Sequence, residues 1–381
     1  MIRHAIAATV LSFSFTALGA AVGPARRAQD ATALEAAAAS GDADAMFRLG
    51  AMVSRKDAAA AVEWYRKAAE AGHAKAMVAL AARHMQGGGV ARDEAKAIGL
   101  YERAAAMGDT TAMFLLGAAF AQGRGVAQDD GEAFAWFTRA AEAGHAGAMT
   151  NLGAAHALGK GVAVDHAKAV SWYTKAAEAG DRRAMSNLAL AHLDGTGTPK
   201  DLSKAMHWLR VAAECGDADA MVALGDHHAR GDESLRDQEA AFRWYARAAE
   251  AGHLHAVVNL GVMHAEGRGT ARDEAKAVEL FTRAADAGVP EAMFNLAGLY
   301  EQGRGVPQSD AQAYFWAMNG KAGLKDEAMR DGADSFASRL AAKLDADTRT
   351  AAEARHLAWS AEPRFDAGRR SMAAATSSKG D

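Results

Sequence analysis

The sequence predicts an all-α fold, an α/α solenoid of eight helix-turn-helix repeats. The main observation is the motif Ala-Met-x-x-Leu, in which Val replaces Met once, and which recurs along most of the chain. Its start points, which lie 36 residues apart after the first interval, are Ala45, Ala76, Ala112, Ala148, Ala184, Ala220, Ala256 and Ala292. A fixed period of this length is typical of stacked repeats, because one helix pair cannot bury its apolar face alone.

The composition agrees with such an array and excludes several other classes of protein. Of the 381 residues, 50% are hydrophobic but only 7% are aromatic, so the apolar content is mostly alanine and suits closely packed helices. A net charge of -4 lacks the basic excess of a dedicated nucleic-acid binder. The single cysteine, Cys215, excludes a disulfide framework and a Cys-based zinc site, and we expect it to be a packed small residue.

Residues 1–21 have the pattern of a secretory signal peptide. Arg3 precedes a mostly apolar stretch over residues 5–18, and the small residues Gly19 and Ala21 suit cleavage after position 21. The stretch is too short and too polar for a transmembrane helix. We therefore expect an exported chain, periplasmic in the first place and secreted as the alternative, with no membrane insertion after cleavage. A frayed N-terminal helix is the other interpretation of this segment.

The repeat array is predicted to occupy residues 42–323 and to be capped at both ends. Residues 22–41 look like a lone second helix of a repeat and are expected to form an N-terminal capping helix. Residues 324–362 are expected to form two capping helices without the repeat motif. The small, polar segment 363–381 is predicted to be a disordered tail, and the chain is expected to be a monomer.

The third repeat illustrates the two helices that we expect in each unit. Helix A spans about residues 109–121 and carries an apolar stripe that includes Ala112, Leu116 and Phe120. A Gly-x-Gly loop follows, whose glycines permit positive φ angles. Helix B then begins at an N-capping Asp or Ser and ends at a glycine. The predicted caps are Asp57, Asp93, Asp129, Asp165, Asp201, Asp237, Asp273 and Ser309.

Residues 148–180 show the full pattern, with Ala-Met-x-x-Leu-Gly, Gly-x-Gly-Val, Asp-x-x-Lys-Ala and Trp-Tyr-x-Lys-Ala-Ala-Glu-Ala-Gly in succession. In this combination the chain resembles the Sel1-like repeat family, a relative of the tetratricopeptide repeat. The resemblance implies an α/α superhelix used for protein–protein interaction and signal transduction, usually without catalysis. A cysteine-rich branch of that family has disulfide-bridged repeats and penicillin binding. This chain has only Cys215, so no β-lactam activity is carried over.

One column of the repeat is rich in histidine. At about 100° per residue this position lies within the core stripe of helix A, so we expect buried and hydrogen-bonded imidazoles. A pH-responsive role is an alternative. A metal ladder is disfavoured, because stacked helices lie about 8–10 Å apart whereas zinc–nitrogen bonds are about 2.1 Å. We expect no metal and no cofactor. The column contains His84, His156, His192, His228 and His264, with Phe120 and Tyr300 at the same place in other repeats.

The face of helix A opposite the core stripe is the candidate partner-binding groove. In the third repeat it presents Thr111, Phe114, Ala118 and Gln122. Apolar residues recur in the Phe114 column without an evident packing role within the repeat, and asparagines recur beside it. An Asn amide both donates and accepts, so it can grip the backbone of an extended peptide. The candidate residues are Phe47, Phe114, Asn151, Asn187, Val222, Val258, Asn259, Phe294 and Asn295.

The alternative for this face is purely structural, with Asn as a repeat consensus and Phe packed on the adjacent repeat. Taken together, the patterns favour a non-catalytic scaffold or adaptor of the cell envelope that binds a protein or peptide in the groove, in signalling or regulation. A secreted effector that binds a host protein is the first alternative. A cell-wall-active or β-lactam-binding protein is the second, and the missing nucleophile-base constellation disfavours it.

Overall fold

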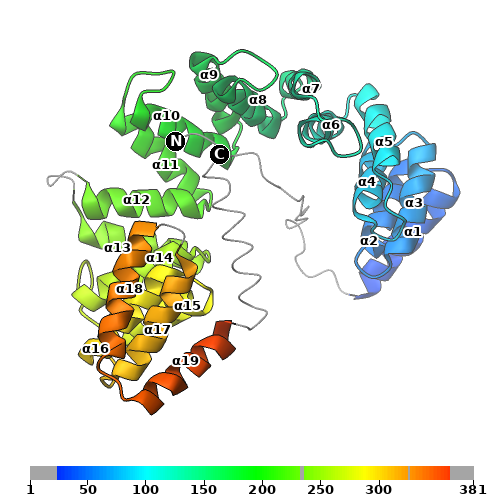
Figure 1. The fold of residues 1–381 in the computed structure, drawn as a ribbon. Helices are drawn as coiled ribbons and strands as arrows, with labels where there is room; N and C mark the ends of the chain where they lie inside the picture. The colour runs from blue at the N-terminus through cyan, green and yellow to red at the C-terminus, as the bar shows by residue number, and fades with distance from the viewer. Residues whose placement is uncertain (1–23, 232–235, 325–326, 361–381) are drawn as a thin grey trace. The chain divides into compact units, whose positions relative to one another are not determined.

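A computed structural model describes residues 24–231, 236–324 and 327–360, and within them all regular structure is helical (Figure 1). The predicted signal peptide and the predicted tail, at 1–21 and 363–381, lie outside the described residues. The chain divides into two compact units between Asp201 and Leu202. None of the described helices combines the length and the apolar character that a membrane crossing requires.

The first unit contains ten described helices, α1 to α10, and within it successive helices pack against each other. Helices α2, α4, α6, α8 and α10 are the A helices of five repeats, and α3, α5, α7 and α9 are B helices. The bounds are α1 Pro24–Ala39, α2 Ala43–Val53, α3 Ala58–Glu70, α4 Ala74–Gln86, α5 Glu94–Ala106, α6 Thr110–Gln122, α7 Asp130–Glu142, α8 Ala146–Leu158, α9 His166–Glu178 and α10 Arg182–Asp194.

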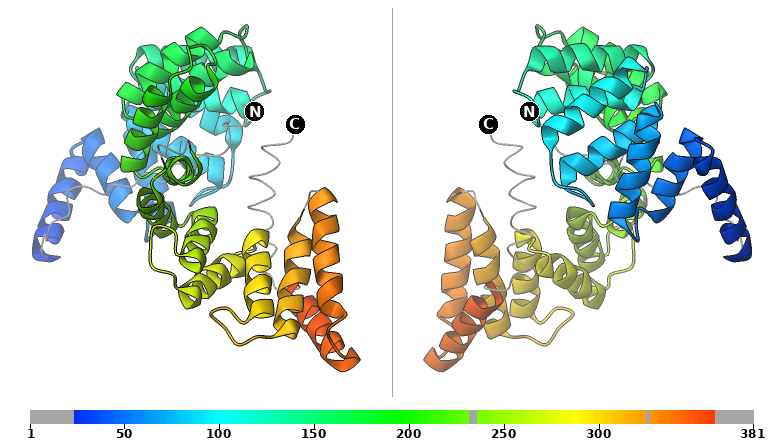
Figure 2. Two further views of the ribbon diagram at one scale, coloured as in Figure 1. Left: turned by 90° about the vertical axis from the view of Figure 1, so that its left-hand side faces the viewer. Right: turned by 90° about the vertical axis from the view of Figure 1, so that its right-hand side faces the viewer.

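The second unit has nine described helices, and from α11 to α18 successive helices again lie side by side (Figure 2). The last repeat helix, α17, contacts both α18 and α19. Sequential packing of this kind within each unit confirms the predicted all-α solenoid. The bounds are α11 Leu202–Glu214, α12 Ala218–Arg230, α13 Gln238–Glu250, α14 Leu254–Glu266, α15 Glu274–Asp286, α16 Pro290–Gln302, α17 Asp310–Gly323, α18 Glu327–Ala341 and α19 Ala346–Ser360.

Polar side chains cap the B helices as the sequence predicts. Each observed cap accepts a hydrogen bond from a backbone N–H in the first turn of its helix, which satisfies a donor that has no partner inside the helix. The caps seen in this role are Asp57, Asp93, Asp129, Asp165, Asp237, Asp273 and Ser309.

Three A helices are capped by histidine, which the sequence patterns did not indicate. The Nδ1 atoms of His73, His145 and His253 accept the backbone N–H of the residue three positions later, at 3.1 to 3.2 Å. On the other side of the ring, Nε2 of His253 lies 3.0 Å from Oδ1 of Asp219 in the preceding A helix. These imidazoles therefore join neighbouring repeats. The cap requires an Nδ1 atom without a proton, because this nitrogen accepts the hydrogen bond.

The core follows the leucine of the repeat motif. Leu116, Leu152 and Leu224 are no more than 1% exposed. Trp136 packs against an apolar cluster that extends from α3 to α6 and so spans the first three repeats, and the guanidinium of Arg139 lies over its ring, 4.6 Å from the centroid. Each repeat therefore buries its apolar face against its neighbour, which is the source of stability in a solenoid.

The second glycine of the Gly-x-Gly loop sets how closely repeats approach. In the loop after α8, Gly161 has a φ of 67°, and a Cβ there would lie 2.0 Å from the carbonyl oxygen of Asp130 in the preceding B helix. Only glycine fits this position, because the backbone is left-handed and the contact is with backbone atoms. The loop after α12 differs already at its start: Gly231 is extended, whereas the C-caps of helices such as α14 are left-handed.

Candidate partner-binding site

Two phenylalanines of the predicted groove are packed rather than free. The ring of Phe114 stacks on His145 with centroids 4.5 Å apart, and the ring of Phe47 stacks on His73 at 4.9 Å. These stacks on the next A helix agree with the structural alternative, in which Phe packs on the adjacent repeat. Each ring also lies beside an aromatic ring of its own repeat, Phe114 at 5.9 Å from Phe137 and Phe47 at 5.8 Å from Tyr65, so the expectation of no packing role within the repeat is wrong for both.

Other members of that column are buried as well. Val78 and Val258 are 8% and 7% exposed, and Thr150 is 4% exposed. Val222 and Phe294 are half-buried. The column therefore borders the core instead of lying opposite to it, which corrects the predicted orientation of this face.

The asparagines beside that column behave differently from the apolar residues. All four are half-buried, and among the described residues none of their side-chain amides forms a hydrogen bond within the protein; they are Asn151, Asn187, Asn259 and Asn295. By contrast, the buried Asn319 donates to the carbonyl oxygen of Phe315 and lies 2.9 Å from Nδ1 of His356. An amide without a protein partner at a partly open position can bind an external backbone. Whether these amides hold a partner stays a prediction.

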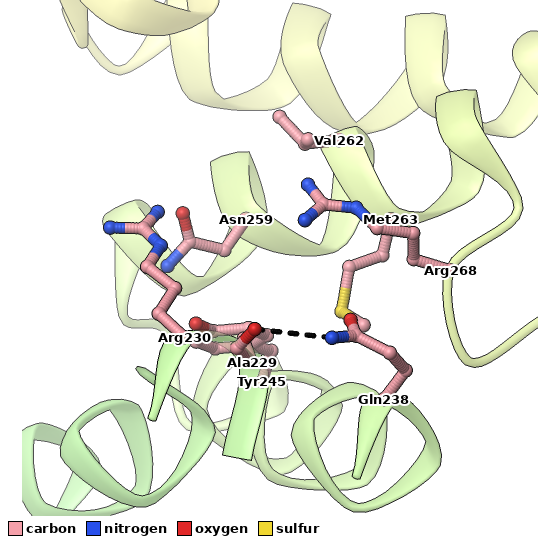
Figure 3. A pocket seen from close by; sticks show the side chains of 8 residues that line it. All are labelled: Ala229, Arg230, Gln238, Tyr245, Asn259, Val262, Met263 and Arg268. Atoms are coloured by element: carbon pink, nitrogen blue, oxygen red, sulfur yellow. Dashed lines mark hydrogen bonds between the residues drawn. The ribbon is translucent and has the colours of Figure 1, made fainter. Parts of the chain in front are cut away.

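An open cavity of about 320 Å³, including space continuous with solvent, lies at the junction of the sixth and seventh repeats (Figure 3). We call it the junction 6/7 pocket. It is lined from α12 by Ala229 and Arg230, from α13 by Gln238 and Tyr245, from α14 by Asn259, Val262 and Met263, and from the following loop by Arg268. Three of these residues belong to predicted groove positions: Asn259, Val262 in the Ala118 column, and Arg230 in the Gln122 column.

The polar groups of the pocket are incompletely paired. The hydroxyl of Tyr245 donates to Oδ1 of Asp226 at 2.7 Å, and burial together with this contact raises the pKa of the phenol. The amide nitrogen of Gln238 donates to the carbonyl oxygen of Ala229 at 3.1 Å, whereas its Oε1 is buried without a partner (Figure 3). Nε of Arg268 pairs with Glu266 at 2.7 Å.

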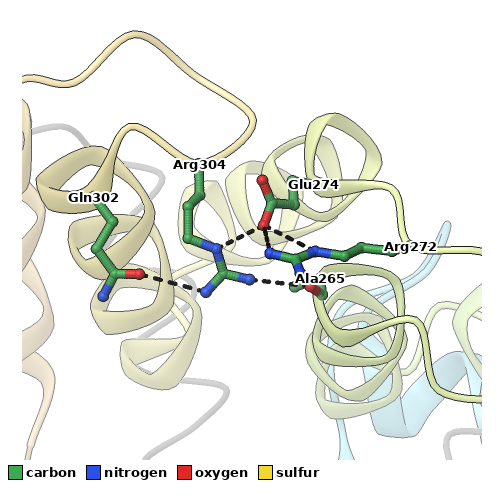
Figure 4. A network of polar contacts seen from close by, with 5 residues as sticks. All are labelled: Ala265, Arg272, Glu274, Gln302 and Arg304. Atoms are coloured by element: carbon green, nitrogen blue, oxygen red, sulfur yellow. Dashed lines mark hydrogen bonds and ion pairs between the residues drawn. The ribbon is translucent and has the colours of Figure 1, made fainter.

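At the junction of the seventh and eighth repeats, the residues at equivalent positions are paired with one another (Figure 4). Oε1 of Glu274 accepts from Nε of Arg272 at 3.2 Å and from Nε of Arg304 at 2.6 Å, and Nη2 of Arg304 also donates to the carbonyl oxygen of Ala265 at 3.0 Å. The hydrogen bonds from Arg272 and Arg304 lower the pKa of the Glu274 carboxyl. We call this arrangement the junction 7/8 network.

Three histidines of the column, His84, His156 and His192, are buried as predicted, whereas His228 and His264 are half-buried, and the expected hydrogen bonding is only partly present. Nδ1 of each of the five imidazoles is buried without a hydrogen-bond partner among the described residues, at His84, His156, His192, His228 and His264. Burial lowers the pKa of His156 and of His228. The hydrogen-bonded role is therefore wrong for the Nδ1 atoms, because apolar and aromatic neighbours such as Phe134, 5.5 Å from the ring of His156, fill the space around them.

Two smaller expectations can also be compared with the structure. Cys215 is exposed, so its prediction as a packed residue is wrong; it lies between the last residue of α11 and the turn glycine Gly216. Across the described ranges, no three His, Cys, Asp or Glu side chains come together as metal ligands would.

Sequence reasoning missed the arginines of the pocket. Arg230 and Arg268 were not singled out, because isolated basic residues on a mixed-charge surface carry no pattern of their own. A signal was nevertheless present: Arg-x-Glu followed by Arg thirty residues later occurs at the junction 7/8 network, and Gln238 replaces the glutamate in the equivalent pattern at the pocket.

Helix pairs stacked in chain order within each unit define an α-solenoid repeat protein. The Sel1 repeat matches the chain eight times, over residues 35–73, 74–109, 110–145, 146–181, 182–217, 218–253, 254–289 and 290–317. The chain therefore belongs to the Sel1 repeat family. Proteins of this family are generally scaffolds for protein–protein interaction, typically without catalysis.

The chain is also similar to several solved structures. A Sel1 repeat protein from Oxalobacter formigenes is 28% identical, with a TM-score of 0.63 over 81% of this chain and 90% of the other. A protective antigen from uropathogenic Escherichia coli strains is 25% identical, with a TM-score of 0.39 over 89% and 96%. An immunity protein from Pseudomonas aeruginosa is 21% identical, with a TM-score of 0.35 over 61% and 82%. Comparison with curated proteins gives no match.

Proposed function

We propose that this protein is a non-catalytic scaffold of the cell envelope, where it binds a protein or peptide partner along the A helices of its repeats. The observation that carries the proposal is the set of four half-buried asparagines whose amides lack a hydrogen-bond partner among the described residues. Asn151 and Asn187 lie one repeat apart, as do Asn259 and Asn295. Regular spacing of donor-acceptor groups suits an extended chain that runs across successive repeats.

The packing around these amides supports binding rather than a core role. Unlike Asn319, which is 3% exposed and hydrogen-bonded, the four asparagines keep contact with solvent. Loss of a core amide leaves a buried group unpaired, whereas an open amide loses only solvent contacts. Replacing these asparagines should therefore affect a partner more than the fold.

The test is affinity capture from an envelope extract with the chain lacking residues 1–21, followed by mass spectrometry. We expect the double variant Asn151→Ala, Asn187→Ala to lose the partner while its helical CD and melting midpoint stay as in the unmodified chain. The matched control is Gln128→Ala with Ser171→Ala, which changes two exposed polar residues of the same unit. Partner capture by the asparagine variant at the level of the control would contradict the groove proposal.

The envelope location is part of the same proposal and rests on the composition of residues 1–21. We expect the mature chain in the periplasmic fraction, starting at Val22. N-terminal sequencing of fractionated protein checks this. Recovery of the intact chain from the cytoplasm would contradict export, and recovery from the medium would favour the secreted alternative.

A further inference from the structure

We propose that the junction 6/7 pocket binds a carboxylate of the protein or peptide partner, which takes the place that Glu274 fills in the junction 7/8 network. This proposal rests on the proposed function and adds the chemistry of one contact to it. It is drawn from a comparison of equivalent positions in two neighbouring repeats of the same chain.

The two junctions share their arginines but not their carboxylate. Arg272, Glu274 and Arg304 of junction 7/8 correspond to Arg236, Gln238 and Arg268 of junction 6/7. The same Arg-Glu-Arg set occurs in the first unit, where Nη2 of Arg92 lies 2.5 Å and Nε of Arg124 lies 3.9 Å from Oε1 of Glu94. With glutamine at the centre, the site keeps both cations and loses the internal anion.

The side chains at junction 6/7 have other partners: Arg268 pairs with Glu266, whereas Arg236 and Gln238 bind backbone carbonyls. Nε of Arg236 donates to the carbonyl oxygen of Gly231 at 2.9 Å. The amide nitrogen of Gln238 donates to the carbonyl oxygen of Ala229. At junction 7/8 the equivalent carbonyl, that of Ala265, accepts from Arg304 instead. Arg268 consequently has neither the carboxylate nor the carbonyl that hold Arg304, and its side chain lines an open pocket (Figure 3).

The donors that remain are suited to a carboxylate. Arg230 is exposed and forms no ion pair with another described residue, and the amide of Asn259 has no partner within the described ranges. The two nearby carboxylates are already engaged, Asp226 by the hydroxyl of Tyr245 and Glu266 by Nε of Arg268. Among the described side chains of the site, Arg230, Arg236 and Arg268 outnumber Asp226 and Glu266 by one positive charge, and guanidinium groups bind carboxylates through paired N–H donors.

The equivalent positions of junction 7/8 would not accept this ligand. Arg230 is replaced there by Glu266, and the pocket-facing Gln238 by Glu274. There the charges of Arg272 and Arg304 are balanced by Glu266 and Glu274, and both arginines are already bound to Glu274. The junction 6/7 pocket is therefore distinguished by its charge as well as by its opening.

The test measures fluorescence anisotropy of labelled octapeptides with the full chain. The first probe alternates Glu and Ala and has an amidated C-terminus; the second has Gln for Glu and is amidated; the third is the Gln peptide with a free C-terminal carboxylate. We expect the second to bind at least about tenfold more weakly than whichever carboxylate probe binds best. Tighter binding of the first identifies a side-chain carboxylate, and tighter binding of the third a chain end.

Variants connect this binding to the pocket. Gln238→Glu restores the internal anion, and Arg268→Gln removes a donor; we expect each to weaken the best probe at least about tenfold. Arg243→Gln removes one positive charge from the exposed face of α13 and should leave affinity unchanged within about twofold. Circular dichroism checks that each variant is folded.

Three results would overturn the proposal: equal binding of the Glu and amidated Gln probes, unchanged affinity in folded Gln238→Glu, or competition by inorganic phosphate as strong as that by the carboxylate probe. These results are distinguishable from failure of the proposed function. A partner whose capture depends on Asn151 and Asn187 but not on Gln238 would refute the carboxylate pocket and leave the scaffold intact.

Discussion

Junctions 6/7 and 7/8 occupy equivalent places in successive repeats, yet one leaves a pocket open and the other closes it with ion pairs (Figures 3 and 4). The helices that surround them have the same lengths, and the core leucines are equally buried, with Leu224 and Leu296 both 0% exposed. The difference lies in a few polar side chains at the loop. A solenoid can therefore vary its binding surface one repeat at a time while its core stays constant.

The largest effect that we expect is a loss of stability on changing the core leucines, which the two junctions share. Leu224→Ala and Leu296→Ala should each cost about 2–5 kcal/mol, because both leave a cavity in a packed core. Urea unfolding monitored by helical CD would measure this loss. The exposed Leu357, at 66%, provides the control, and its replacement by Ala should cost less than about 0.5 kcal/mol. A strongly unequal cost at the two leucines would show that the junctions differ in their cores as well.

A smaller loss of stability, due to His228 of the sixth repeat, should appear as the pH is lowered. Burial lowers the pKa of His228, with Arg210, Arg243 and His227 acting in the same direction and Asp237 opposing them. The unfolded chain therefore binds the proton first, at about pH 6.5, so this contribution to stability is present above that pH and is lost as the pH falls.

We accordingly expect the melting midpoint to fall between about pH 7.5 and 5. His228→Tyr should reduce this fall, since Tyr300 fills the same column in the eighth repeat, whereas replacement of the exposed His255 by Ala should not. Parallel pH profiles of the His228 variant and the unmodified chain would contradict this assignment.

The smallest effect should come from opening the junction 7/8 network. Glu274→Gln removes the central carboxylate and should lower the melting midpoint at neutral pH by much less than the leucine changes, since the group is close to solvent. Because Arg272 and Arg304 hold its pKa below the ordinary value of 4.5, its contribution is present above that value and is lost as the pH falls through the lowered pKa.

The difference between this variant and the unmodified chain should therefore shrink on acidification below about pH 4.5. Glu250→Gln, on the exposed end of α13, is the control. If Glu274→Gln matched this control at pH 7, the junction 7/8 network would contribute nothing measurable to stability.

Much of the fold could be predicted because it depends on residues that are close together in the sequence. Helix A of the third repeat was expected over 109–121 and is observed as Thr110–Gln122, and the aspartate caps act as predicted. The histidine caps were missed, because histidine is not among the residues that commonly cap helices. The orientation of Phe114 was also misjudged, since its cover comes from His145, which begins the next helix pair.

For the candidate binding site, the sequence predicted a face of the A helices but no pocket on it. The asparagine positions follow from the period, but the division between residues 201 and 202 and the pocket at junction 6/7 have no counterpart in the repeat pattern. The pocket depends on which polar group each arginine reaches, and alternative partners compete within a few ångströms of each guanidinium.

By itself, the sequence determined the period, the alternation of two helices, the caps and the identity of the core leucines. These properties depend on residues within one repeat, where spacing and chemistry are enough to place them. Only the tertiary structure decided which polar side chains remain without a partner. The reason is that such partners come from different repeats, as with Arg304 and Glu274, thirty positions apart in the chain and 2.6 Å apart in space.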